Sequence, residues 1–156
     1  MISSLIPFAT DQERFAWIAA MVDAESHLGI TNTRNPNCRT DQRYYLPRLL
    51  CENTNFKLIK EYQVAVGCGT IRESGKRKSR KPHWKRSWEL QLTPNDLRKV
   101  LPPVLPFLVA KKQQAQLILK ALSILSNCNP RTTKVRHTRL AILQKEISAL
   151  NRGVHA

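Results

Sequence analysis

The chain has 156 residues, four cysteines and a formal net charge of +15. This length is typical of one domain, here residues 1–156, and a domain of this size can bury a core without disulfides or a structural metal. The cysteines lack Cys-x-x-Cys spacing, so we expect neither a disulfide scaffold nor a zinc site. No run of about 18 apolar residues occurs, so we expect no membrane span. No secretory signal is visible, and we expect an intracellular location in the cytoplasm, the nucleoid or an organelle. The positive charge favours a polyanionic partner, above all a nucleic acid.

The first predicted element is a helix from about Asp11 to Asp23, in which the eight residues 15–22 carry no charge and no hydroxyl, so that this part of the helix is apolar on all of its faces. Thr10 is suited to cap it, and Glu13 completes a capping box. A helix of this kind must be buried all round. Two acids nevertheless follow the apolar stretch, Asp23 and then Glu25, which we expect at the C-terminal end of the helix. Because the negative end of a helix disfavours a carboxylate, something else must stabilise Glu25, and a divalent cation such as Mg²⁺ is the simplest candidate.

Two strands are predicted next, over residues 27–35 and 43–53, with a turn-like segment between them. Side chains alternate between the two faces of a strand, so Thr31, Thr33 and Asn35 share a polar face opposite the apolar residues. These short polar side chains are suited to hydrogen-bonding the edges of bases.

The later elements are predicted from hydrophobic periodicity, from capping residues and from residues that break helices. They are a helix over 55–66 capped by Asn53 or Thr54, strands beginning at 70 and 84 joined by a basic connection, a short helix from 94 that Pro102, Pro103 and Pro106 end, and helices over 107–126 and about 132–152. The order predicts an α+β fold: an antiparallel sheet of two hairpins with helices on one face and a polar, basic opposite face. The core covers about residues 10–126.

Residues 18–26, Ile-Ala-Ala-Met-Val-Asp-Ala-Glu-Ser, resemble the Leu-Ala-Gly-Leu-Ile-Asp-Ala-Asp-Gly motif of the LAGLIDADG homing endonucleases. Outright matches are Ala19, Asp23 and Ala24, and conservative departures are Ile18, Met21, Val22 and Glu25. Ala20 and Ser26 stand where the motif has its two glycines. Pro106–Ala115 resembles the segment of the single-motif enzymes in which Pro-Phe-Leu precedes a helix start rich in Lys and Gln.

No second copy of the motif occurs, so the chain resembles the single-motif, homodimeric group. The resemblance implies an αββαββα fold with a curved DNA-binding sheet and extra C-terminal helices. It also implies that Glu25 binds Mg²⁺ or another divalent cation, assisted by the backbone carbonyl of Ala24. Two copies of the motif helix would pack about a two-fold axis through the interface residues Phe15, Ile18, Ala19, Ala20, Val22 and Asp23.

Two further catalytic residues follow from the resemblance. Lys111, or Lys112 if the alignment slips by one position, would approach the scissile phosphate and polarise the attacking water. Asn53 occupies the position that the family uses near the reactive water, with Glu52 as the alternative; an equally weighted interpretation is that Asn53 only caps the following helix.

DNA binding is predicted for the polar strand face and the basic segments. Phosphate contacts would supply most of the affinity, and strand side chains would select bases in the major groove. The predicted residues are Thr31, Thr33, Arg34, Asn35, Arg43, Arg48, Arg72, Ser74, Lys76, Arg77, Lys78, Arg80, Lys81, Lys85, Ser87 and Glu89.

The expected function is that of a homing endonuclease: a homodimer that makes a metal-dependent double-strand break, by phosphodiester hydrolysis, at a long pseudo-palindromic site in double-stranded DNA. Two alternatives use the same fold. One is a maturase that binds intron RNA and assists splicing, and the other is a DNA-binding regulator that does not cleave.

Overall fold

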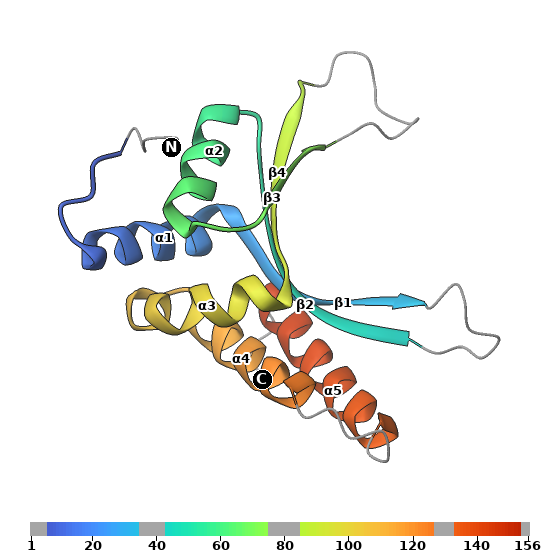
Figure 1. The fold of residues 1–156 in the computed structure, drawn as a ribbon. Coiled ribbons are helices and arrows are strands. Elements are labelled where there is room, and N and C mark those ends of the chain that lie inside the picture. The colour runs from blue at the N-terminus through green and yellow to red at the C-terminus, as the bar shows by residue number, and fades with distance from the viewer. Residues whose placement is uncertain (1–5, 35–42, 75–84, 127–132, 154–156) are drawn as a thin grey trace.

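The computed structural model describes residues 6–34, 43–74, 85–126 and 133–153, and it has the predicted α+β fold (Figure 1). Within these residues, no helix combines the length and hydropathy needed to span a bilayer. The elements in chain order are α1 (Asp11–Glu25), β1 (Ser26–Arg34), β2 (Arg43–Asn53), α2 (Phe56–Val66), β3 (Thr70–Ser74), β4 (Ser87–Leu92), α3 (Pro94–Val104), the 3₁₀ turn η1 (Leu105–Phe107), α4 (Lys112–Ser126) and α5 (Thr133–Asn151).

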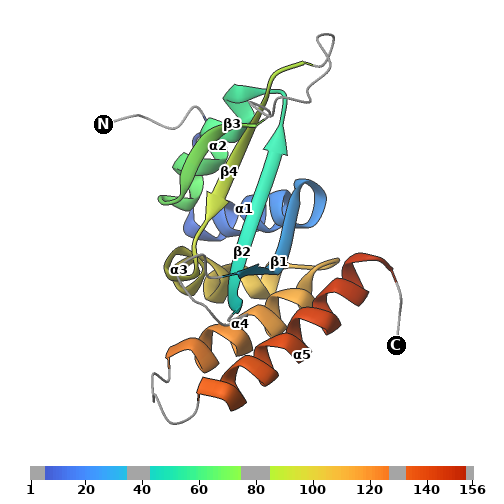
Figure 2. The same cartoon turned by 90° about the vertical axis from the view of Figure 1, so that its right-hand side faces the viewer.

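The four strands form one antiparallel sheet in the order β1-β2-β4-β3, built from two hairpins. The hairpins point in different directions in Figure 1, so the sheet is curved, and α1 and α2 lie on one side of it. Figure 2 shows β2 and β4 in front of these helices. We call the helix-covered side the inner face and the opposite side the outer face.

Strand register assigns each side chain to a face. The inner face carries the core of the protein, including Leu28, Leu49, Leu90 and Leu92, which are fully buried. The outer-face positions, taken from β1 to β3, are His27, Gly29, Thr31, Thr33, Tyr44, Leu46, Arg48, Leu50, Glu52, Ser87, Glu89, Gln91, Thr70, Arg72 and Ser74.

Helix α1 begins as predicted and ends two residues later than predicted. Thr10 Oγ1 accepts a hydrogen bond from the backbone N–H of Glu13 at 3.2 Å, and the Glu13 carboxylate accepts from the N–H of Ala9 at 2.8 Å. The expectation that this helix is buried all round is wrong for the single chain. Ala16 and Ala20 are exposed, because the core covers only one side of the helix.

Two predicted helix boundaries are also corrected. Helix α3 continues through Pro102 and Pro103; a proline inside a helix costs about 3 kcal/mol, but the fully buried Leu101 and Val104 hold this last turn against the core. Conversely, α4 does not begin at residue 107. Its first helical residue is Lys112, because the preceding backbone N–H groups bind a side chain of α1, as described below.

Helix α5 covers the edge of the sheet at β1. Gln144 Nε2 donates to the carbonyl of Ile30 at 3.2 Å, and Asn151 Nδ2 donates to the carbonyl of Leu28 at 3.0 Å. These side chains occupy edge carbonyls that would otherwise be available to another strand. Val135, near the start of this helix, is 55% exposed.

Candidate functional site

The carboxylate of Glu25 lies at the junction of α1 and β1, beside the end of β2. Asn53 Nδ2 donates to Glu25 Oε2 at 3.2 Å. Asn53 Oδ1 accepts from the backbone N–H of Asn55 at 2.8 Å, which fixes the orientation of the amide. The cap of α2 is Asn55, whose side chain accepts from the N–H of Leu58 at 3.3 Å. The expectation that Asn53 or Thr54 caps this helix is therefore wrong.

Lys111 contributes the positive charge of this cluster. Its Nζ donates to the carbonyls of Val22 and Asp23, both at 2.8 Å, and to the carbonyl of Ser26 at 2.6 Å. Burial lowers the pKa of the ammonium, and the nearby charges of Asp23 and Glu25 act in the opposite direction. An ammonium at this position offsets the negative end of α1. It therefore favours the carboxylate of Glu25 at that end of the helix.

All three N–H donors of Lys111 are occupied by these carbonyls. An ammonium has three donors and no acceptor, so contact with a phosphate would require it to exchange at least one of these bonds. Lys112, the alternative residue, is exposed at the first position of α4.

Asp23 connects the same end of α1 to the start of α4. Its Oδ2 accepts from the backbone N–H groups of Val109 at 2.8 Å and Ala110 at 3.1 Å, and its Oδ1 accepts from the N–H of Lys111 at 2.8 Å. Unpaired N–H groups at a helix start favour an anion. Asp23 and Lys111 thus form a reciprocal clasp, in which each charged side chain binds the backbone around the other.

The predicted interface residues differ in how far the single chain already buries them. Ile18, Ala19 and Val22 are 2%, 1% and 0% exposed in the single chain, and both carboxylate oxygens of Asp23 are bonded within it. These side chains belong to the core or the clasp, because the inner face of the sheet and η1 cover that side of the helix. The remaining predicted residues are the half-buried Phe15 and the exposed Ala20.

Ser26 fits its position without the flexibility of glycine. Its backbone is extended, with φ −103° and ψ 147°, a conformation open to any residue. Its hydroxyl donates to the carbonyl of Met21 at 3.0 Å and lies 3.3 Å from the hydroxyl of Tyr62. Burial raises the pKa of Tyr62 and also that of the Cys51 thiol.

Two oxygen donors of a kind suited to a hard cation belong to consecutive residues at the end of α1. They are the exposed carboxylate of Glu25 and the carbonyl of Ala24, which is not among the three carbonyls that Lys111 binds. Mg²⁺ takes such ligands and usually keeps several waters. No three His, Cys, Asp or Glu side chains converge within the described part of the chain.

The predicted DNA-binding residues fall into three groups. Those on the outer face are Thr31, Thr33, Arg48, Arg72, Ser74, Ser87 and Glu89. A second group lies elsewhere. Arg34 and Arg43 stand opposite one another at the ends of β1 and β2, at positions that the strand alternation assigns to the inner face. Lys85 is exposed just before β4. Those outside the described residues are Asn35, Lys76, Arg77, Lys78, Arg80 and Lys81.

Sequence reasoning missed that Glu52 belongs to the outer face. It lies directly opposite Glu89, and its Oε1 accepts from Ser87 Oγ at 2.6 Å. The residue that bonds to Glu25 is Asn53, not Glu52. Alternation from the buried Cys51 would have given this assignment.

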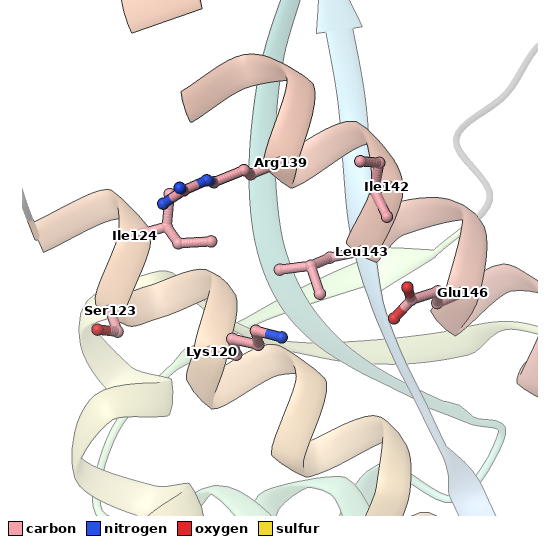
Figure 3. A pocket seen from close by; sticks show the side chains of 7 residues that line it. All are labelled: Lys120, Ser123, Ile124, Arg139, Ile142, Leu143 and Glu146. Atoms are coloured by element: carbon pink, nitrogen blue, oxygen red, sulfur yellow. The ribbon is translucent and has the colours of Figure 1, made fainter. Parts of the chain in front are cut away.

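A separate cavity lies between α4 and α5 and has a volume of about 370 Å³ (Figure 3). The lining residues are Lys120, Ser123, Ile124, Arg139, Ile142, Leu143 and Glu146. None of them belongs to the cluster at the end of α1.

No protein-family model and no curated protein sequence matches the chain. Solved structures do match it. The homing endonuclease I-CvuI, crystallised in complex with the I-CreI target, is 24% identical with a TM-score of 0.73, over 90% of this chain and 83% of that chain. The archaeal intron-encoded homing endonuclease I-Vdi141I, complexed with DNA, is 16% identical with a TM-score of 0.72, over 90% and 86%. The homing endonuclease I-TnaI is 17% identical with a TM-score of 0.65, over 90% and 97%.

Proposed function

We propose that this chain, which has the fold of the LAGLIDADG homing endonucleases, is a site-specific DNA endonuclease that hydrolyses phosphodiester bonds as a homodimer. The observation that carries the proposal is the cluster of Glu25, Asn53 and Lys111 at one end of a curved sheet with a polar outer face. The net charge of +15 supports a nucleic-acid partner.

Glu25 and the carbonyl of Ala24 would hold a divalent cation, since both offer oxygen to a hard ion. A bound cation would stabilise the attacking water and the leaving oxygen of a phosphodiester. The amide of Asn53 holds the Glu25 carboxylate in one orientation. The clasp of Asp23 and Lys111 fixes the backbone from which that carboxylate projects, and such fixed geometry is what positioning in catalysis requires.

The homodimer would form through the side of α1 that the core leaves exposed. Ala16 and Ala20 lie there, with the half-buried Phe15 beside them. Small side chains let two helices approach closely, and a two-fold axis along this surface would bring two copies of Glu25 near one another. Two chains related in this way would bind a pseudo-palindromic duplex.

The test uses a duplex that joins the sequences flanking the insertion site of the gene itself. The wild-type chain should cut both strands when Mg²⁺ is added and leave them intact in EDTA. Glu25→Gln should abolish cleavage while DNA affinity stays within about tenfold, or roughly 1.4 kcal/mol. Glu146→Gln is the matched control, because Glu146 is an exposed acid on α5, and it should cut at the wild-type rate.

The alternatives give different results in the same assay. A maturase would bind the intron RNA and leave the duplex whole, and a regulator would bind the duplex without cutting it in any buffer. Cleavage by Glu25→Gln at a near-normal rate would refute the metal assignment even if the wild-type chain is a nuclease.

A further inference from the structure

Glu89 is a carboxylate on the face proposed to meet a polyanion. It lies in β4, directly opposite Arg72 of β3 on one side and Glu52 of β2 on the other. Arg72 is exposed and Glu89 is half-buried. Among the strand residues that the structure describes, Glu52 and Glu89 are the acids of the outer face.

Two electrostatic repulsions disfavour a carboxylate at position 89 of the outer face. Like charges directly opposite on neighbouring strands destabilise a sheet, and the field of the phosphates repels an anion. Ser87 donates a hydrogen bond to Glu52 at 2.6 Å. Within the described residues, by contrast, no hydrogen bond or ion pair joins Arg72 to Glu89, although the register places them opposite one another. The half-buried Glu89 carboxylate is therefore open to a donor from a ligand.

We propose that Arg72 and Glu89 together read one G·C base pair in the major groove. This inference rests on the proposed DNA binding. In that groove guanine presents two acceptors, N7 and O6, and cytosine presents the donor N4–H₂. The Arg72 guanidinium donates to both guanine atoms, and the Glu89 carboxylate accepts from N4 of the paired cytosine. Opposed side chains on adjacent strands start only about 5 Å apart, so one pair can reach both edges of one base pair.

The same two side chains discriminate against the other base pairs. A C·G pair in the reverse orientation places the N4 donor against Arg72 and the two acceptors against Glu89. An A·T pair places the O4 acceptor and the methyl group of thymine near Glu89. Both arrangements place Arg72 or Glu89 against a mismatched group. A T·A pair still presents the O4 acceptor to Arg72 and the N6–H₂ donor to Glu89, so it is disfavoured only by the loss of one of the two Arg72 hydrogen bonds. The preference for G·C is therefore strongest against C·G and A·T.

A binding selection tests this inference. The full-length protein is mixed with a pool of duplexes that carry a long randomised segment, and the retained duplexes are sequenced. Wild-type chains should select G·C in one orientation at one position, repeated at the symmetric position of the second half-site. Glu89→Gln and Arg72→Gln should each weaken the preference at that same position by about tenfold, the range expected for one specific base contact. Thermal unfolding of each variant checks that the fold is retained.

Glu73→Gln is the matched control, because Glu73 is a neighbouring acid on the inner side of the same hairpin and lies 3.6 Å from Arg86 Nε. It should leave every base preference unchanged. The inference is overturned if the wild type selects a defined site in which Glu89→Gln and Arg72→Gln alter different positions, or none. Retention of duplexes without any sequence preference overturns it as well and still allows a DNA-binding protein. Retention of no duplex refutes the proposed function itself.

Discussion

Replacing Asp23 by Asn tests the clasp at the end of α1. The carboxylate accepts three backbone N–H bonds, from Val109, Ala110 and Lys111, at 2.8, 3.1 and 2.8 Å. Asn keeps the shape of the side chain but offers one acceptor oxygen, and its NH₂ group would face an N–H donor. At least one N–H therefore loses its partner, and the other bonds lose the assistance of a charge.

Losing one hydrogen bond to a charged group costs about 1.5–3 kcal/mol, and the weakening of the other two brings the total to about 3 kcal/mol. For a chain of this length, that loss corresponds to a fall in Tm of about 6–12 °C. Urea unfolding followed by circular dichroism gives the free energy, and a thermal scan gives Tm. The m-value should not change if the variant remains folded.

Asp11→Asn is the control for this prediction, because it makes the same chemical change on the same helix. Asp11 has a side chain 78% exposed and pairs with Arg14 at 3.0 Å. Exposed pairs and helix-end charges contribute at most about 1 kcal/mol. If Asp23→Asn destabilises the protein no more than Asp11→Asn does, the clasp does not stabilise the fold and the reasoning is refuted.

Lys111→Met should lower the free energy of unfolding by about 2 kcal/mol, because three carbonyls lose their donor. The control Lys112→Met should change the free energy of unfolding by no more than about 0.5 kcal/mol, as surface substitutions do. Equal effects of the two substitutions in urea unfolding would contradict the clasp. Ala19→Leu should destabilise each chain by about 1–3 kcal/mol through overpacking. Ala20→Leu should shift sedimentation toward monomer and remove only the part of Tm that depends on protein concentration; a dimer that survives Ala20→Leu would exclude the proposed interface. Burial raises the pKa of Cys68 to about 11, so the folded chain keeps a proton that the unfolded chain releases from about pH 8.5. Stability should fall between these pH values, and Cys68→Ser should reduce the fall; an equal fall in both proteins would contradict the shift.

The order of the elements was predictable because its signals are local. Thr10 and Glu13 mark the start of α1 by their spacing alone, and the alternation of polar and apolar residues in β1 assigns Thr31 and Thr33 to the outer face. The selection of Asn53 as a site residue depended on the family resemblance, and its contact with Glu25 was not predicted. Their hydrogen bond joins residues 28 positions apart, and no local pattern encodes such a contact.

Local reasoning failed where a distant group alters a local preference. The prolines at 102 and 103 predict the end of a helix, but core packing carries α3 past them. The segment before Lys112 has helical periodicity, but its N–H groups bind Asp23 from 86 to 88 residues away. In both places the tertiary contact contributes more free energy than the local propensity.

The sequence by itself determined the face of Thr31 and Thr33 in β1, the first cap and the basic character of the chain, because capping and alternation act between near neighbours and charge is a sum over residues. Only the tertiary structure decided that Lys111 binds the carbonyls of α1, that Ile18 and Val22 lie in the core of the single chain, and that Arg72 stands opposite Glu89. These facts depend on strand register and helix packing, which bring together groups that are distant along the chain.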